Sequence, residues 1–430
     1  MARAMKDSGI EWIGEIPEGW ESKRLKYIVS YSDESLGEDT DPDYEFDYID
    51  IGSVEYGKGI TQYQHMRFAD SPSRARRVVR DKDVILSTVR TYLKAVATID
   101  DRDNPQIAST GFIVLRAKKG QITPDYLHYS VLSNAFVSLV EAKSTGISYP
   151  AINASDVVEI KIPVPPIIEQ RRIADYLNSE CARIDAVIEQ TRASIEEYKK
   201  LKQSLITQAV TKGIRPGRKM KDSGIEWVGE IPDEWEVRRI KTLFRLRDEK
   251  NYLPLEEVNL ISLYTDKGVL QHCDLEQTTG NKASNADGYK IVYENDIVVN
   301  IILCWMGAIG RSAYTGVTSP AYDIYVPSDE IECRYYHHYF RTKGFSGDCY
   351  KRGKGIMAMR WRTYSDQFRD IPVVMPPIEE QREILDYLDA KTAEIEKLVE
   401  KKEKFLLEME SFKRSLIFEY VTGKKEVKHF

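Results

Sequence analysis

The sequence predicts an α/β fold: two α/β domains separated by two long helices that form an antiparallel intramolecular coiled coil, with a pseudo-twofold internal repeat. Three observations predict this fold class. Two motifs occur twice, a double proline precedes each of two stretches with heptad periodicity, and the segments between the motifs mix β-rich and helical runs. A repeat of this length sets the domain plan of the whole chain.

The repeat is nearly identical where it begins. MKDSGIEWIGEIP from Met5 to Pro17 returns as MKDSGIEWVGEIP from Met220 to Pro232. Later, IPVPPIIEQRRIADYL from Ile162 returns as IPVVMPPIEEQREILDYL from Ile371, which we align with two extra residues before the second double proline. The long segments between these motifs are barely similar. Gene duplication with drift would explain the repeat, but not why the drift is confined to the middles.

The repeat motifs predict the limits of the domains. Similar ends around different middles suggest one task performed on two different targets. The predicted parts are a leading segment with the first domain at 1–164, a first long helix at 165–212, a linker at 213–224, a second domain at 225–374, a second long helix at 375–422 and a C-terminal tail at 423–430.

Each double proline is followed by a predicted coiled-coil helix, because proline can begin a helix but not continue inside one. Apolar residues then recur at alternating gaps of four and three, with Lys202, Lys391 and Lys402 as polar exceptions. A single helix with an apolar seam is unstable in water, so the other copy is the obvious partner. Pairing with another chain is the alternative. The predicted seam is Ile173, Leu177, Ile184, Ile188, Ile195, Tyr198, Leu205, Ile384, Leu388, Ile395, Leu398, Phe405, Met409, Phe412 and Leu416.

Tryptophans recur at matching places in the two leading segments. They stand in short polar runs with proline and glycine, and we interpret them as anchors that pack onto the neighbouring domain rather than as base-stacking groups. They are Trp12, Trp20, Trp227 and Trp235.

Positive charge is concentrated locally in a chain whose net charge is −6. Arginine can pair with phosphates or reach guanine edges, and an aromatic ring can pack on sugars or bases. The loop at 143–150 is less basic than the one at 351–362 but precedes the double proline in the same way. An exposed charged surface without a ligand is the alternative. The candidate DNA-binding residues are Arg74, Arg76, Arg77, Arg80, Arg90, Tyr92, Lys94, Lys143, Ser148 and Tyr149 in the first domain, and Lys351, Arg352, Lys354, Arg360, Trp361 and Arg362 in the second.

Motifs for autonomous catalysis are not found. The double prolines lack the Asp/Asn-Pro-Pro-aromatic context of a methyltransferase, and neither a dinucleotide loop nor a GxxxxGK[ST] loop occurs. A nuclease site at Asp125, Glu159 and Lys161 matches a pattern that is common by chance. Residues 333–338 offer too few ligands for a metal site. We therefore predict no catalytic residue and no metal site.

The composition is that of a cytoplasmic protein. The five cysteines are odd in number and share no CxxC spacing, and the N-terminus lacks the apolar core of a secretory signal. No run approaches the roughly 18 apolar residues that a membrane span needs.

The two-copy plan resembles the specificity subunits of type I restriction–modification systems. The resemblance rests on the GIEWIGEIP-type start and on the PP-x-x-EQ-x-x-I-x-x-[YF]L boundary at Pro165 to Leu177 and at Pro376 to Leu388. It implies a non-catalytic subunit with two target recognition domains, each reading one half of an asymmetric bipartite site in double-stranded DNA. It further implies two modification subunits that use S-adenosylmethionine to methylate adenine N6. Restriction subunits would bring ATP and Mg²⁺, and no cofactor is expected on this chain.

The predicted helices add a geometric hypothesis. A rigid helix pair would set the number of unread base pairs, so that one inserted heptad, about 10 Å of helix, should lengthen the spacer by about three base pairs. The rival interpretation is a coiled-coil scaffold that assembles proteins without reading DNA.

Overall fold

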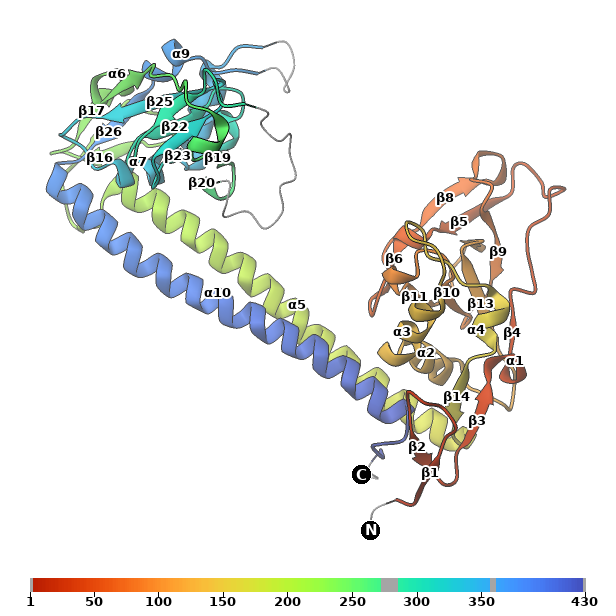
Figure 1. Ribbon diagram of the computed structural model, residues 1–430. Coiled ribbons are helices and arrows are strands. Elements are labelled where there is room, and N and C mark those ends of the chain that lie inside the picture. The colour runs from red at the N-terminus through yellow and green to blue at the C-terminus, as the bar shows by residue number, and fades with distance from the viewer. Residues whose placement is uncertain (1–2, 272–284, 356–360, 428–430) are drawn as a thin grey trace. The chain divides into compact units, whose positions relative to one another are not determined.

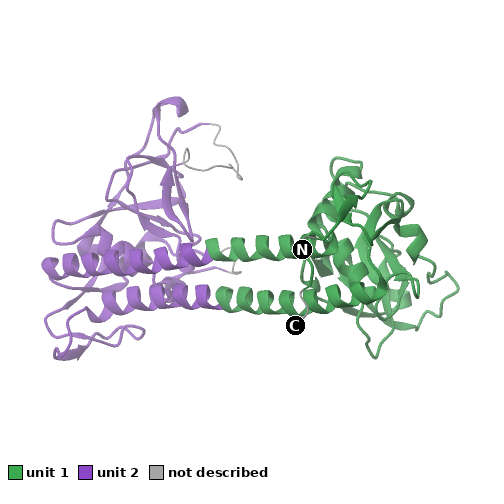
Figure 2. Ribbon diagram, turned by 90° about the horizontal axis from the view of Figure 1, so that it is seen from below, with its two compact units in different colours: residues 1–192, 404–430 green, residues 193–403 purple. Residues whose placement is uncertain are grey.

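The computed structural model describes residues 3–271, 285–355 and 361–427. These residues divide into two compact units (Figure 2). Unit 1 comprises residues 1–192 and 404–430, and unit 2 comprises residues 193–403. Each unit therefore contains one α/β domain together with parts of both long helices.

The domain of unit 1 is built on a four-stranded antiparallel sheet with the strand order β11-β10-β13-β4 (Figure 1). A second four-stranded sheet has the order β8-β5-β12-β9. The elements are β1 (Met5–Asp7), β2 (Glu15–Pro17), β3 (Glu21–Arg24), α1 (Leu25–Ile28), β4 (Val29–Tyr31), β5 (Glu45–Ile49), β6 (Val54–Glu55), β7 (Gly59–Ile60), β8 (Gln64–Arg67), β9 (Ala75–Val79), β10 (Val84–Ser87), β11 (Val96–Thr98), β12 (Gln106–Ser109), β13 (Phe112–Ala117), α2 (Pro124–Leu132), α3 (Asn134–Lys143), α4 (Ala154–Val158) and β14 (Lys161–Val164).

The domain of unit 2 repeats the first sheet in the order β23-β22-β25-β18, although its sequence is barely similar. The elements are β15 (Met220–Asp222), β16 (Glu230–Pro232), β17 (Glu236–Arg239), α6 (Ile240–Leu243), β18 (Phe244–Arg247), β19 (Ile261–Tyr264), β20 (Gly268–Gln271), β21 (Lys290–Val292), β22 (Ile297–Asn300), β23 (Ile309–Arg311), β24 (Gly316–Thr318), β25 (Tyr322–Pro327), α7 (Cys333–Phe340), α8 (Lys343–Arg352), α9 (Ser365–Arg369) and β26 (Pro372–Met375).

The central strands are buried on both faces, which explains their uninterrupted apolar runs. In β10, Val84 and Leu86 belong to the core that contains the helices, whereas Ile85 belongs to the core on the other face of the sheet. Strand β22 divides its side chains in the same way, with Ile297 and Val299 on one face and Val298 on the other. The alternation fixes which face of each sheet meets the helices.

The long helices are α5 (Ile167–Lys212, 46 residues) and α10 (Ile378–Val421, 44 residues). Their pairing is antiparallel in both units. In unit 1, Lys413 Nζ lies 2.6 Å from Asp185 Oδ1 and Arg192 Nη2 lies 2.9 Å from Glu410 Oε1. In unit 2, Lys202 Nζ lies 2.5 Å from Glu396 Oε1. Intramolecular pairing of the two copies is thus confirmed. None of the helices in the described ranges is long and apolar enough to cross a membrane.

Most of the predicted seam lies inside the molecule. Leu398 and Met409 are half-buried, as are Tyr198 and Leu205. The fully buried members of the predicted seam are Ile173, Leu177, Ile184, Ile188, Ile195, Ile384, Leu388, Ile395 and Leu416.

The predicted seam is wrong at Phe405 and Phe412, which are 40% and 51% exposed. On the buried side of α10, Leu406 next to Phe405 packs against the core of unit 1, and Lys413 lies next to Phe412. Lys402 Nζ lies 5.7 Å from the centroid of the Tyr198 ring, and the Lys413 side chain is only 12% exposed. A lysine can lay its aliphatic stem along an apolar surface while its charged end finds a partner. The predicted heptad pattern therefore placed Phe405 and Phe412 on the buried side of α10, whereas both lie on its exposed side.

The leading segment of each repeat packs against the end of the other repeat's helix. Beside β1 and β2, a Cβ added at Gly423 would lie 2.4 Å from Pro17 Cδ, just after α10 ends. In unit 2, a Cβ added at Gly213, after the end of α5, would lie 3.2 Å from Trp235 Cζ2. Trp20 and Trp235 are completely buried, which confirms their interpretation as anchors. Figure 1 shows the end of α10 beside the hairpin of β1 and β2.

Candidate nucleic-acid interface

Two loops of unit 1, at 88–94 and 143–151, are joined by backbone pairing. Ala151 forms antiparallel bridges with both Val89 and Thr145. The Thr91 hydroxyl donates to Ser144 Oγ at 2.8 Å. The predicted residues Arg90, Tyr92, Lys94, Lys143, Ser148 and Tyr149, which are distant in sequence, therefore come from one connected pair of loops.

The loop pair presents polar, basic and aromatic side chains to solvent. Tyr92, Lys143, Ser148 and Tyr149 are exposed. Lys94 is half-buried, with its Nζ 3.4 Å from Glu141 Oε2. Cations supply affinity for phosphates, and hydroxyl groups can read base edges. This combination suits a nucleic-acid ligand better than a small apolar one.

The arginines of the 74–80 segment are placed differently from one another. Arg80 Nη2 lies 2.5 Å from Glu34 Oε1, and Arg77 Nη1 donates to Ser32 O at 3.3 Å. The Arg76 guanidinium lies 4.6 Å from the centroid of the Phe68 ring. Arg74 is exposed. Three of the four side chains thus make contacts inside the domain, whereas Arg74 faces solvent.

The corresponding loop of unit 2 has the same backbone support. Lys354 and Arg362 pair as Thr145 and Ala151 do, and the Thr363 N–H donates to Ile301 O at 2.9 Å. This confirms that the two loops occupy equivalent places. Arg360 lies outside the described residues. The stretch enclosed by this pairing is two residues longer in unit 2 than in unit 1.

The two extra residues that we aligned before the second double proline are therefore misplaced. Leu25 N–H donates to Ile160 O, and Ile240 N–H donates to Ile371 O, each at 3.1 Å. Ile371 thus corresponds to Ile160 rather than to Ile162, and no insertion follows it. The equivalent strands β14 and β26 have the sequences KIPV and PVVM. Matching the letters IPV in the two repeats therefore shifted the alignment by two residues.

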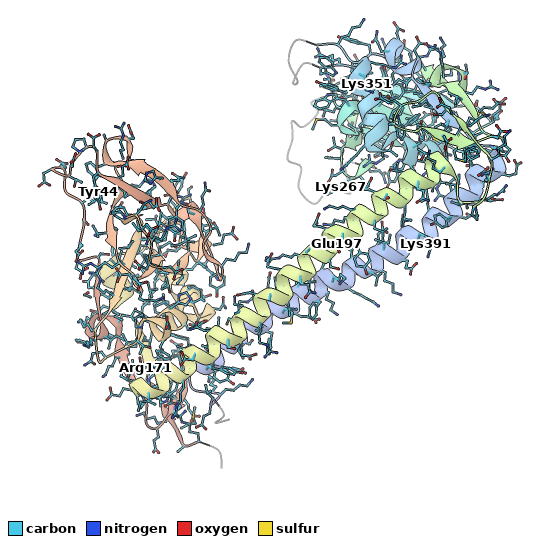
Figure 3. All side chains as sticks on the ribbon, turned by 180° about the vertical axis from the view of Figure 1, so that it is seen from behind. Tyr44, Arg171, Glu197, Lys267, Lys351 and Lys391 are labelled. Atoms are coloured by element: carbon cyan, nitrogen blue, oxygen red, sulfur yellow. The ribbon has the colours of Figure 1, made fainter. Side chains whose placement is uncertain are left out.

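Some of the basic side chains at 351–362 in unit 2 already have partners within the protein. Lys351 pairs with Glu226, and this hydrogen bond lowers the pKa of the Glu226 carboxyl. Trp361 stacks on Tyr350 with ring centroids 5.0 Å apart, and its indole donates to Tyr350 O at 3.1 Å. Arg352 and Lys354 are exposed and Arg362 is half-buried. Figure 3 labels Lys351 on the domain of unit 2. Trp361 therefore supports the loop, and the arginine and lysine side chains around it are the better candidates for DNA contact.

Exposed apolar side chains beside these loops escaped the sequence interpretation. In unit 1, Ile147 is fully exposed. In unit 2, Leu303 and Met306 are exposed in the segment that follows β22, where unit 1 has Arg90 and Lys94 after β10. The only sequence signal for these residues was an apolar side chain in an otherwise polar loop. Such a side chain could equally belong to the core, and composition does not distinguish the two cases.

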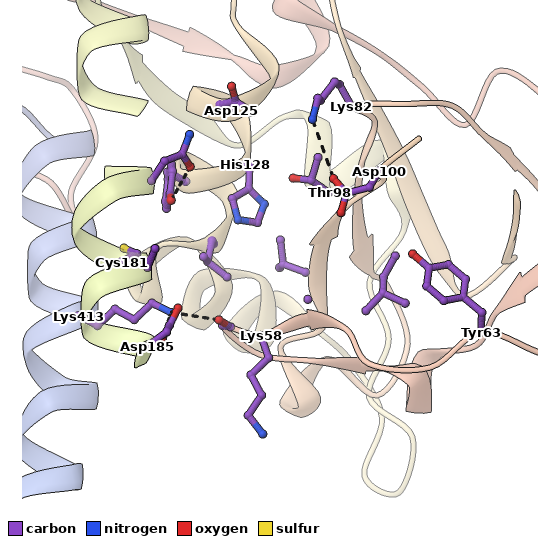
Figure 4. Close-up of a pocket in the computed structure, with 18 residues that line it drawn as sticks. Lys58, Tyr63, Lys82, Thr98, Asp100, Asp125, His128, Cys181, Asp185 and Lys413 are labelled. Atoms are coloured by element: carbon purple, nitrogen blue, oxygen red, sulfur yellow. Dashed lines mark hydrogen bonds and ion pairs between the residues drawn. The ribbon is translucent and has the colours of Figure 1, made fainter. Parts of the chain in front are cut away.

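Several titratable side chains gather in one cavity away from these loops. A cavity of about 470 Å³ in unit 1 lies between the α/β domain and the helix pair and is lined by Asp125, His128, Cys181 and Lys413 among others (Figure 4). Burial, then the charge of Lys413, lowers the pKa of His128 to about 4. Lys413 Nζ also donates to Gly57 O at 3.1 Å, which ties the turn between β6 and β7 to the helices.

The residues weighed for metal or nuclease chemistry have other partners. Cys333 Sγ donates to Asn295 O at 2.7 Å, and His337 Nδ1 accepts from Arg311 N–H at 3.1 Å. Glu159 pairs with Arg24 and Lys26. Within residues 3–271, 285–355 and 361–427 no group of three or more His, Cys, Asp and Glu side chains could hold a metal ion.

Two diverged domains on one sheet plan, each with a loop held by the same backbone pairing, define a duplicated recognition protein. The family model of the type I restriction modification DNA specificity domain matches residues 17–197 and 232–404, and the chain belongs to this family. It is the specificity subunit of a type I restriction–modification system, the non-catalytic component that recognises DNA.

Relatives and solved structures agree with this assignment. In Methanocaldococcus jannaschii, a protein named for the MjaX specificity subunit of a type I restriction enzyme is 26% identical over 97% of this chain and 96% of its own length. The MjaVIII specificity subunit of that organism is 32% identical over 34% of this chain and 32% of its own length. A chain from a structure on complex assembly of the type I R-M system gives a TM-score of 0.72 at 22% identity, covering 95% of this chain and 99% of that one. The HsdS subunit of Thermoanaerobacter tengcongensis gives 0.52 at 23% identity, covering 95% and 98%.

Proposed function

We propose that each α/β domain reads one half of an asymmetric bipartite site in double-stranded DNA. The observation that carries the proposal is the equivalent loop support at Thr145 to Ala151 and at Lys354 to Arg362, where the same backbone pairing holds unrelated sequences. Two domains that recognise different half-sites need a loop with the same backbone support and different side chains. Basic side chains on these loops would contact phosphates, while the variable polar side chains would read base edges.

The reaction belongs to partner subunits. Two modification subunits would dock on this chain, bring S-adenosylmethionine and methylate adenine N6 within the site. Restriction subunits, with ATP and Mg²⁺, would join through them. Family membership supports this division, as does the solved structure that concerns assembly of a type I R-M system.

The helix pair would set the spacer between the half-sites. The lengths of α5 and α10, 46 and 44 residues, support a continuous helical connection. One heptad inserted into both helices at facing positions adds about 10 Å, and the spacer should grow by about three base pairs. If an active variant kept the original spacer in methylome sequencing, the helix pair would not be the ruler.

The deciding experiment is methylation mapping in a host without endogenous adenine methylation. The full chain is expressed with its modification subunits, and the methylated motif is read by sequencing. Replacing residues 225–374 with those of a relative should change one half of the motif and leave the other unchanged. A change in both halves would contradict the division of labour. Methylation without any motif would favour a scaffold that does not read DNA.

A further inference from the structure

Ile147 is fully exposed, at 103% of its reference surface, in the loop between Thr145 and Ala151. An isoleucine at such a place contributes nothing to the core, and burying it against a ligand would be favourable. Its exposure is not explained by the fold of unit 1. A ligand that covers it would explain it.

The loop holds Ile147 in a defined position before any ligand arrives. Ala151 pairs with Thr145 on one side and with Val89 on the other. Gly146 has a φ of +107°, and a Cβ there would lie 3.2 Å from Tyr149 O, so the turn is tight. The side chain is therefore presented by a supported loop rather than by a free tail.

The surroundings of Ile147 point to a polar ligand with one apolar group. Lys143, Ser148 and Tyr149 flank it in the same loop and are exposed, and Arg90 stands in the adjoining loop. A protein partner would cover a larger apolar area, because the core of such an interface is depleted in charge. In the major groove of DNA, the base edges present hydrogen-bonding groups and one apolar group, the 5-methyl of thymine.

We infer that Ile147 contacts the methyl group of a thymine in the half-site that the first domain reads. This inference rests on the proposed function and deepens it, because it makes Ile147 a specificity-determining residue. Ser148 and Tyr149 would make the neighbouring hydrogen bonds, while Lys143 and Arg90 would pair with phosphates.

The test uses the complex of the full chain with its modification subunits and DNA carrying the motif found by methylation mapping. Each thymine of the first domain's half-site is replaced in turn by deoxyuridine, which removes only the methyl group. Losing one methyl contact corresponds to about 0.8 kcal/mol, or a roughly fourfold weaker binding. The natural protein should lose about fourfold at one thymine, whereas Ile147→Ala should bind thymine and deoxyuridine DNA equally.

A matched control is Leu253→Ala, which removes an exposed apolar side chain from unit 2 away from these loops. This variant should keep the deoxyuridine effect in the first domain's half-site. A half-site without thymine, or equal binding of both DNAs by the natural protein, would overturn the inference while leaving the proposed function intact. Equal weakening of Ile147→Ala on specific and scrambled DNA would also overturn it. Absence of sequence-specific binding by the natural complex would instead overturn the proposed function.

Discussion

Replacing Arg218 with methionine should destabilise unit 2 far more than replacing Arg3 destabilises unit 1. The two arginines pair with equivalent carboxylates in the two repeats, Arg218 with Glu380 and Arg3 with Glu169, and Arg218 also lies 3.5 Å from Glu234. A buried tryptophan donates to the same carboxylate at 2.9 Å in each unit. The difference is burial. The Arg218 and Glu380 side chains are 12% and 3% exposed, whereas those of Arg3 and Glu169 are 29% and 24% exposed.

The expected magnitudes follow from that difference. Removing one partner of a buried ion pair costs about 3–5 kcal/mol, because the other charge is left without compensation. A pair with more solvent access costs about 1 kcal/mol. Burial raises the pKa of Glu380, but hydrogen bonds from Arg218 and Trp235 more than offset this and hold the pKa below 4.5. The stability from this pair is therefore present at neutral pH and is lost as the pH falls below 4.5 through the folded-state pKa.

Hydrogen exchange of the full chain measures the effect locally. At neutral pH, a loss of about 3 kcal/mol corresponds to a more than hundredfold loss of amide protection in β16 and β17. The variant Arg3→Met should lower protection in β1 and β2 by roughly tenfold or less. The double variant Arg218→Met with Glu380→Gln should regain much of the loss, because it leaves no unpaired charge and the glutamine can still accept from the Trp235 indole. Equal losses in the two single variants would refute the argument from burial.

Three further predictions test the helices, a buried histidine and the loops. Leu388→Ala should lower the free energy of unfolding by about 2–5 kcal/mol in urea titrations, whereas Phe405→Ala, on the outer face, should change it by less than about 1 kcal/mol. Burial, then the nearby His338 and Arg341, lowers the pKa of His337 from 6.5 to about 3, so protonation of the unfolded state lowers stability as the pH falls below 6.5. The variant His337→Gln, which can still accept from Arg311 N–H, should show a smaller loss of melting temperature between pH 7 and pH 4.5. Arg90→Ala should weaken DNA binding and reduce the salt slope by about one, whereas Arg80→Ala, whose side chain is paired with Glu34, should change neither in filter-binding titrations.

The features that sequence reasoning could reach are the periodic ones. The double prolines and the heptads predicted two long helices of the two copies that pair antiparallel, and the doubled tryptophans predicted anchors. The shared sheet order of the two domains could not be predicted, because VILS in β10 and IVVN in β22 are only two of many apolar runs that suit a strand buried on both faces. The predicted seam was wrong at Phe405 and Phe412 because their neighbours Leu406 and Lys413 are the residues on the buried side of α10.

The DNA-binding residues could be predicted only in part, because a count of lysines and arginines does not show which of them are already paired with carboxylates. Arg80 and Lys351 have carboxylate partners inside their own units. Ile147 was overlooked because an exposed apolar residue has no distinctive sequence signal. The two extra residues were assigned to the boundary because the shared letters IPV determined the alignment. The correct register is shown by the backbone hydrogen bonds of Leu25 to Ile160 and of Ile240 to Ile371.

The way each unit is completed explains why the repeats remain alike at their ends and not in their middles. The Tyr126 hydroxyl donates to Val421 O at the end of α10, and the Tyr335 hydroxyl donates to Val210 O near the end of α5. A change at the end of either helix must therefore suit a domain and a leading segment that belong to the other repeat. The loops at Thr145 to Ala151 and at Lys354 to Arg362 are held mainly by backbone pairing, so their side chains are less constrained. Duplication alone does not predict this division, whereas the exchange of helix ends between the repeats favours it.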